Sequence, residues 1–550
     1  MTAHEELEKA FLAELEALEK FRISYTAQYP DVPLSHDDPD VRRLIEALAF
    51  FTGRTRLSAM RSLDESVLRI FRQHFPSLLG PCPAMAMLRA IPGPAFADAT
   101  VLPAGTEVVL RRPGEDDDEP DRLFRFRTLS TLKILPLRIQ SVDLLSLHGR
   151  GPRLLIRIVA HTPTNQPLDE IRLHVNHLDD LRSSITVLHE LKRHVRGASV
   201  FYEPRPAEDA TGQPCQVSFG TVEDEEALPD AFEQPLQRAR LRLRFPRRDL
   251  FVTVRGIRPP RNWQFVTLCL ELDERWPKKL RLTSDAFELF TVPMINVQRD
   301  LANPIECDGT KDRYPLRHPD ESAHFVPLSV IGAYRPTKAG FVPLLPGVLG
   351  VDGDSYEIVT EGRGETRRAY ALFRIPGAFE KPERISVDAF WHQPGLRGVE
   401  VGSLKVGLSE HFVEGVSWVC SGPIVPDADS HIDTDRDAQL ELVSLKALRF
   451  LGKAQLALLL RACGAHAEPL YAKLVSAIAD VRVTNKPFGK RSHGLKYVYE
   501  IEFSMLEQSD LPRLATFCEW LLDLLVVWST EEVLEVVANV PNLSTELRFG

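Results

Sequence analysis

The sequence predicts an α+β multidomain protein with an N-terminal helical arm, a β-rich middle and a small C-terminal α+β domain. Apolar residues recur at helical spacing through most of the first 75 residues. After Pro83 the pattern changes to short strands separated by proline and glycine, and helical spacing returns near position 441. We therefore expect a helical arm (1–82), two β-rich domains (83–245 and 246–440) and a C-terminal domain (441–550).

The composition argues against several functional classes. The chain has 550 residues, with 67 Lys and Arg against 77 Asp and Glu, a formal net charge of −10. A general nucleic-acid binder normally carries a basic excess, so we expect no nucleic-acid partner. The seven cysteines are scattered without a CxxC pair, which is typical of buried thiols in a reducing compartment.

Neither a secretory signal nor a membrane span is expected. The segment Met1–Glu6 is acidic and has no apolar core, and no run of about 18 apolar residues occurs. The sequence therefore favours a cytoplasmic protein without direct membrane insertion. It shows no motif for a catalytic residue, a cofactor or a metal, so we expect none of these.

The helical arm begins with an expected helix over residues 4–28. Its apolar stripe consists of Leu7, Phe11, Leu15, Leu18 and Tyr25. Asp38 is placed to cap a new helix that has Pro39 at its first position. Two further helical runs, Val41–Leu57 and Leu63–Phe75, follow and include Leu44 and Leu48.

Charge separates within this arm. Residues 1–40 are acidic, whereas residues 41–89 carry eight arginines against three acidic residues. The simpler interpretation is two solvated faces. The alternative is a helix bundle whose charges help to choose partner and orientation.

The middle of the chain contains polar segments with two interpretations each. The acidic run in Gly114–Asp121 is read as a solvated loop rather than a cation site, and residues 221–235 as an acidic linker. His174, His177, His189 and His194 are expected to be structural, because their spacing does not fit a metalloprotease. Gly347–Gly353 does not match a dinucleotide motif, and Asp427–Asp435 departs from an EF-hand at positions six and twelve.

Residues 238–245 alternate strictly between basic and apolar side chains. This alternation predicts a strand with Arg238, Arg240, Arg242 and Arg244 on one face. A half-exposed strand with an arginine face is the simpler interpretation. The alternative is a docking patch for an acidic protein surface, and nucleic acid ranks third because interleaved aromatic residues are missing.

The last hundred residues predict a small α+β domain. Helices are expected over Leu442–Ala462, Glu468–Ala479 and Asp510–Val527. Strands are expected at Val481–Thr484, Lys496–Phe503 and Glu532–Val540. The last of these strands can close its own sheet or pair with another copy.

A series of short motifs occurs in order along the first 316 residues. The first part of the series is Leu63-Asp64-Glu65, Phe75-Pro76, Pro83-Ala84-Met85-Ala86, Leu102-Pro103-Ala104-Gly105-Thr106 and Phe124-Arg125-Phe126-Arg127-Thr128. The second part is Phe245-Pro246-Arg247-Arg248, Phe287, Val292-Pro293-Met294-Ile295-Asn296-Val297, Pro304-Ile305 and Tyr314-Pro315-Leu316. Each motif alone is weak, but their shared order resembles the TssF family, the wedge subunit of the type VI secretion baseplate, which is similar to the wedge protein of contractile phage tails.

The resemblance implies a structural protein without catalysis. Two copies would join one TssG-like partner through bundled N-terminal helices, with the β domains as a wing and the C-terminal domain as a contact between copies. TssE-, TssK- and VgrG-like proteins would be further neighbours in the baseplate, which would dock near the inner membrane. Ten residues are the candidate interface: Leu7, Phe11, Leu15, Leu18, Leu44, Leu48, Arg238, Arg240, Arg242 and Arg244.

Three other functions stay open at this point. One is a wedge protein of another contractile injection system or of a phage tail. Another is a β-rich carbohydrate-active enzyme, although no pair of carboxylates can be assigned to a cleft from spacing. The third is a nucleic-acid-binding module that uses Arg238–Arg244.

Overall fold

The computed structural model describes residues 3–31, 34–35, 38–114, 121–145, 151–206, 210–220, 234–338, 340–347, 353–409, 413–430, 432–488, 494–529 and 533–550. These residues form two compact units, residues 1–79 with 432–447 and residues 80–431 with 448–550. Most of the acidic loop 114–121, of the linker 221–235 and of the glycine-rich segment 347–353 lies outside the described residues. The predicted α+β class, with N-terminal helices and a β-rich middle, is confirmed.

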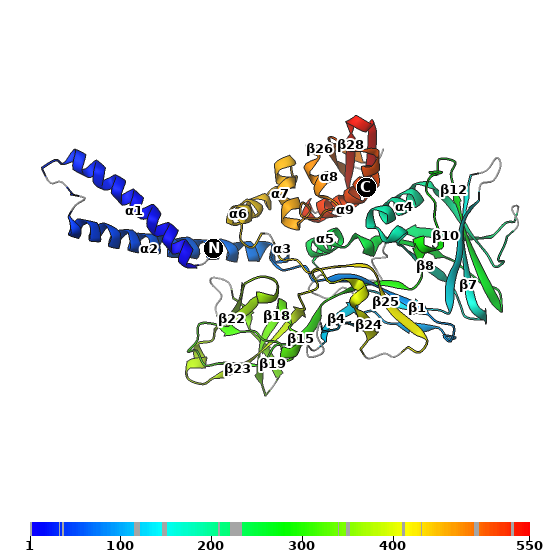
Figure 1. Cartoon of the computed structure of the whole chain (residues 1–550), viewed down its shortest axis with the longest axis horizontal. Helices are drawn as coiled ribbons and strands as arrows, with labels where there is room; N and C mark the ends of the chain where they lie inside the picture. The colour runs from blue at the N-terminus through cyan, green and yellow to red at the C-terminus, as the bar shows by residue number, and fades with distance from the viewer. Residues whose placement is uncertain are drawn as a thin grey trace. The chain divides into compact units, whose positions relative to one another are not determined.

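The smaller unit is helical. Helix α1 (Ala3–Gln28) folds back antiparallel along α2 (Pro39–His74), which continues through the gap between the two predicted runs (Figure 1). Asp38 caps α2 as predicted, because its side chain accepts a hydrogen bond from the Asp40 N–H at 2.9 Å. The C-terminal half of α2 packs against α6 (Arg436–Leu445), and Arg436 pairs with Asp64 at 3.1 Å.

The two largest sheets of the second unit are antiparallel. The six-stranded sheet has the order β24-β3-β4-β14-β1-β25: Lys405–Leu408, Glu107–Arg112, Arg122–Thr128, Thr291–Ile295, Met85–Pro92 and Val416–Val425. The eight-stranded sheet has the order β13-β8-β11-β10-β9-β12-β7-β6: Phe287–Glu288, Glu170–Val175, Phe251–Arg255, Gln213–Phe219, Val195–Phe201, Trp263–Leu272, Arg153–Thr164 and Leu137–Leu145. The expected domain border at 245 falls inside the second sheet, because β10 pairs with β11.

Two smaller sheets share a core around the fully buried Trp391. One contains β15 (Gln298–Leu301), β23 (Glu383–His392), β18 (Val326–Thr337) and β19 (Gly340–Pro343), with β16 (Ile305–Cys307) also on β23. The other contains β17 (Tyr314–Pro315), β22 (Arg368–Arg374), β21 (Ser355–Glu361) and β20 (Leu345–Pro346). A separate pair joins β2 (Thr100–Leu102) to β5 (Leu132–Ile134).

The C-terminal part is the predicted small α+β arrangement. Its sheet has the order β26-β27-β28-β29, over Ile478–Phe488, Gly494–Phe503, Leu534–Val540 and Thr545–Phe549. Figure 1 shows α7 (Lys453–Cys463), α8 (Ala472–Ser476) and α9 (Leu511–Ser529) beside this sheet. The predicted helix over Leu442–Ala462 is wrong as a single element, because α6 ends at Leu445 and α7 begins at Lys453. Strand β28 closes its own sheet between β27 and β29.

Two motifs of the sequence meet in one turn. The Thr106 backbone N–H donates to the Thr128 hydroxyl at 3.1 Å, and the Gly105 N–H donates to the Thr128 carbonyl at 2.8 Å. Gly105 has φ +82°, a backbone conformation that glycine adopts without strain. Gly105 of the motif at 102–106 and Thr128 of the motif at 124–128 therefore belong to one hydrogen-bonded turn.

Glu288 joins the two largest sheets. Its carboxylate is buried and accepts hydrogen bonds from Arg89 of β1 (3.1 Å), Asn176 (3.1 Å), His174 of β8 (3.2 Å) and the Ser421 hydroxyl of β25. Burial favours the neutral acid, but the hydrogen bond and charge of His174, with Ser421 and Arg89, outweigh it and lower the pKa of Glu288 to about 2. The carboxylate is therefore ionised at neutral pH.

The first prediction concerns the close approach of α1 and α2. A Cβ atom at Gly53 would lie 3.3 Å from the backbone of Ala10 and Phe11. The larger side chain of Gly53→Leu should force the helices apart and cost about 1–3 kcal/mol of hairpin stability. Amide exchange in α1 should then become at least roughly tenfold faster.

Ser58→Leu is the matched control, because Ser58 is exposed on the same helix. If both variants exchange at the same rate as the unaltered protein, α1 does not depend on the contact at Gly53.

The second prediction concerns Glu288. Its pKa is lower in the folded state (about 2) than its ordinary value of 4.5, so its ionisation stabilises the fold above pH 4.5 and this contribution disappears as the pH falls through about 2. Glu288→Gln should lose about 3 kcal/mol of unfolding free energy at pH 7. The difference between the two proteins should shrink steadily below pH 4.5 in urea denaturation.

Glu274→Gln, at an exposed position, provides the control and should follow the unaltered protein at every pH. A difference for Glu288→Gln that stays constant from pH 7 to pH 3 would contradict the assigned electrostatic role.

Candidate interaction surface

The α1–α2 hairpin exposes many large apolar side chains. Leu44 (63% exposed), Leu48 (45%) and Phe51 (64%) lie at positions i, i+4 and i+7 of α2 and so share one face, which we call the α2 stripe. Further exposed apolar residues of the two helices are Leu12, Phe21, Ile23, Phe50, Met60, Leu63 and Ile70. In soluble proteins a concentration of this kind is typical of an interaction surface.

Helix geometry explains why these residues stay exposed. Within the first half of α2 the buried residues are Ala49 and Gly53, both small, and Gly53 lies against the backbone of α1. A pair of helices can bury only the stripe on each helix that faces the other. Within the described part of this unit, α6 covers only the C-terminal half of α2, and the apolar residues named above stay exposed.

The predicted apolar stripe of α1 is intermediate in solvent exposure. Leu7, Phe11, Leu15 and Leu18 are half-buried, rather than exposed. The predicted helix is confirmed, and the half-burial of these residues fits a face that lies partly against α2. The α1 residues that are most exposed, Phe21 and Ile23, fall outside the predicted stripe.

Ion pairs connect the oppositely charged helices. Arg56 pairs with Glu14 at 2.8 Å, and Arg61 pairs with Glu6 at 3.1 Å. These arginines are mostly solvent-exposed, so each pair contributes less than about 1 kcal/mol. The pairs favour the observed antiparallel direction of α1 and α2.

The predicted arginine strand is wrong. Residues Pro235–Arg244 form helix α5, in which Arg240 is buried and donates to the Gly80 carbonyl at 3.2 Å. Its residues have high helix propensity and none is β-branched, and Pro235 occupies a first-turn position. The helix propensity of these residues outweighs their alternation of basic and apolar side chains, because tertiary packing buries side chains on both faces of the helix.

Most arginines of α5 make contacts within the same chain. Arg242 pairs with Asp249 at 3.1 Å and with Asp523 of α9, and Arg244 pairs with Glu468 at 2.7 Å. Leu241 and Phe245 pack into a core with strands β1 and β14. Of the four candidate arginines, only Arg238 is exposed.

The histidines also make contacts within the fold. The two ring nitrogens of His174 lie 3.2 Å from Glu288 and 3.2 Å from the Arg247 carbonyl. His194 lies on α4 (Leu181–His194), a helix that sequence reasoning missed, and contacts Asp273 at 2.6 Å. Among the described residues, no three His, Cys, Asp or Glu side chains are grouped as a metal site.

The aspartates of the segment 427–435 have local partners. Asp429 accepts a hydrogen bond from the Gly364 N–H at 3.1 Å, and Asp435 caps α6 by accepting from the Ala438 N–H at 3.0 Å. The border between the two compact units falls within this segment, after residue 431. No helix of the described residues has the length and apolar character that a membrane crossing requires.

The family model described as "Type VI secretion system, TssF" matches residues 3–333. No curated protein sequence matches the chain.

Two solved structures share the fold. A chain of the type VI secretion system TssK-TssF-TssG baseplate subcomplex, determined by cryo-electron microscopy, is 18% identical with a TM-score of 0.74, covering 93% of this chain and 98% of that chain. A chain of the baseplate complex from the type VI secretion system is 16% identical with a TM-score of 0.61, covering 97% and 96%. The family match covers more than half of the sequence and confirms the resemblance carried by the motifs: the chain belongs to the TssF family of type VI secretion baseplate proteins.

Proposed function

We propose that this chain is a structural wedge component of a type VI secretion baseplate and that its α1–α2 hairpin docks against helices of a TssG-like partner. The observation that carries the proposal is the α2 stripe of Leu44, Leu48 and Phe51. Residues at i, i+4 and i+7 are the pattern by which one helix fits a groove formed by others. Burying each side chain would contribute about 1.5–3 kcal/mol.

The solved structures support the choice of partner. The first is the structure of a baseplate subcomplex of TssK, TssF and TssG. We extend this arrangement to the present chain, with a second copy of the chain in the wedge and TssK-, TssE- and VgrG-like neighbours in the baseplate. In this proposal the protein works in the cytoplasm as a platform component, without catalysis.

The proposed surface differs from the set expected from sequence. Leu44 and Leu48 remain in it and Phe51 joins them. Leu7, Phe11, Leu15 and Leu18 are half-buried on α1 and lie outside this stripe. Arg238 stays a candidate contact, whereas Arg240, Arg242 and Arg244 already bind groups of their own chain.

The third prediction tests the α2 stripe. Leu44→Glu with Phe51→Glu places two charges where the proposed complex excludes water, so binding of the partner should weaken by at least about a hundredfold. The measurement is co-expression with the adjacent genes of the operon, followed by tagged pull-down and native mass determination. The unaltered chain should co-purify as two copies with one smaller partner.

Phe341→Glu with Leu345→Glu is the matched control, because these residues are similarly exposed on β19 and β20. This control should retain the partner, and circular dichroism should show equal helix content in both variants. Loss of the partner in both variants, or in neither, would be evidence against docking through the α2 stripe.

A further inference from the structure

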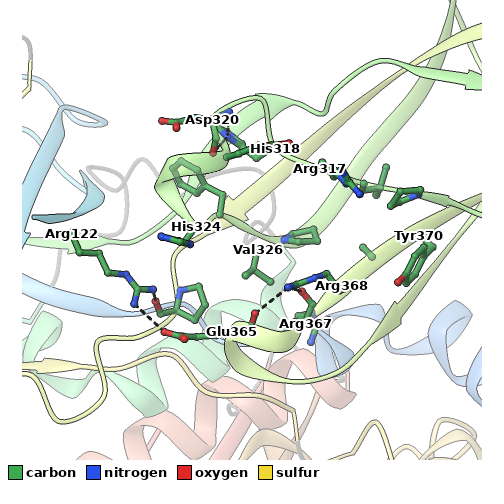
Figure 2. A pocket seen from close by; sticks show the side chains of 17 residues that line it. Arg122, Arg317, His318, Asp320, His324, Val326, Glu365, Arg367, Arg368 and Tyr370 are labelled. Carbon is green, nitrogen blue, oxygen red and sulfur yellow. Dashed lines mark hydrogen bonds and ion pairs between the residues drawn. The ribbon is translucent and has the colours of Figure 1, made fainter. Parts of the chain in front are cut away.

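A polar pocket of about 620 Å³ lies in the larger unit (Figure 2). It is formed by the start of β4, the segment between β17 and β18, and the turn before β22. Its volume is within the range of sites that hold small molecules or a few residues of a peptide. Its charged lining residues are four arginines, Arg122, Arg317, Arg367 and Arg368, and three acidic residues, Asp320, Glu321 and Glu365.

Several of these charges are already paired. Arg122 pairs with Glu365 at 3.1 Å, as Figure 2 shows, and Asp320 pairs at 3.3 Å with Arg125, which lies outside the lining. Arg367 is buried and lies 3.9 Å from Asp429. These pairs account for two of the three acidic groups and two of the four arginines.

The remaining lining residues include more arginines than carboxylates. Arg368 is exposed, and its guanidinium group donates hydrogen bonds to the backbone carbonyls of Glu365 (3.1 Å) and Arg367 (3.0 Å). Arg317 is exposed and has no carboxylate partner among the residues that the structure describes. Among the lining residues that the structure describes, the guanidinium groups of Arg317 and Arg368 therefore outnumber the one carboxylate without a cationic partner, that of Glu321, in a chain that is acidic as a whole.

The pocket is held in shape before any ligand enters. The His318 ring is buried and lies 4.2 Å from the Phe325 ring and 5.1 Å from the Trp391 ring. Its Nδ1 atom accepts the Asp320 backbone N–H at 3.0 Å. These contacts fix the segment that carries Arg317, and binding to a side chain on a fixed backbone costs less conformational entropy than binding to a mobile segment.

The lining matches an acidic side chain better than a polyanion. A guanidinium group binds a carboxylate through two parallel hydrogen bonds. Val326, Tyr370 and Pro394 provide apolar surface for the methylene groups of such a side chain. The carboxylates of Asp320, Glu321 and Glu365 would repel a group with several charges, such as pyrophosphate or a nucleic-acid backbone.

We propose that this pocket receives an aspartate or glutamate side chain of a partner protein, whose carboxylate binds Arg317 and Arg368. A basic residue next to that side chain in the partner would complement Glu321. This contact is separate from the α2 stripe, so it supplies a second, charge-dependent attachment to another protein.

The fourth prediction tests the pocket in the full-length chain. The probe is a fluorescein-labelled peptide of sequence Gly-Glu-Lys-Glu-Gly with blocked ends, and its partner peptide has glutamine at both glutamate positions. Fluorescence anisotropy at low ionic strength should show binding of the glutamate peptide alone. Arg317→Glu with Arg368→Glu should weaken this binding by at least about tenfold.

Lys278→Glu with Lys279→Glu makes the same change in net charge at exposed positions outside the pocket and should bind the glutamate peptide normally. Arg317→Gln with Arg368→Gln removes the charge without introducing repulsion and should show the same loss at an unchanged melting temperature. Either equal binding of the two peptides or equal loss in the pocket and lysine variants would overturn the proposal.

Pyrophosphate is the competing probe. If it binds the unaltered chain but not the pocket variants, while neither peptide binds, the pocket is a small-anion site and the proposal fails. The arginine variants should still co-purify with the wedge partner, and the α2 stripe variant should still bind the peptide. Failure of one proposal is therefore distinguishable from failure of the other.

Discussion

A single buried carboxylate, that of Glu288, links the two largest sheets of the protein through hydrogen bonds. Its donors come from β1 and β25 of the six-stranded sheet, from β8 of the eight-stranded sheet and from Asn176. An ionised group at this depth is tolerated only when its oxygens are satisfied, and here each oxygen accepts two hydrogen bonds. The arrangement specifies one relation between the sheets, which an apolar contact of equal area would leave less well defined.

The two units differ in how completely they bury their large apolar side chains. In the larger unit the aromatic residues Trp391, Phe245 and Phe517 are fully buried by sheets and helices of the same chain. In the α1–α2 hairpin, Phe21 and Phe51 are mostly exposed, because two helices cannot enclose them. The larger unit thus buries these aromatic residues within the chain itself, whereas the hairpin leaves apolar surface exposed that the proposed partner would cover.

Local signals predicted the elements that depend on local physics. The Asp38 cap and the α1 periodicity were identified because capping and amphipathicity are properties of neighbouring residues. Helix α5 was missed because its alternation of Arg and Leu imitates a strand, although its helix propensity was a usable signal. The pocket could not be predicted, because Arg122, Arg317 and Arg368 come together only through tertiary structure.

The candidate surface, unlike the pocket, could be predicted in part from the sequence. Its apolar character also differs from the charged pocket in the kind of contact that it can make. Leu44 and Leu48 were found from sequence, but the exposure of Phe51 depends on which face of α2 lies against α1, and Gly53 determines that face. An apolar contact on this face releases water and is nearly independent of salt, so it suits a permanent subunit interface. A contact through Arg317 and Arg368 is weakened by salt and contributes more to orientation than to affinity. The hairpin therefore suits stable assembly, and the pocket suits alignment of a neighbouring protein that has already been brought close.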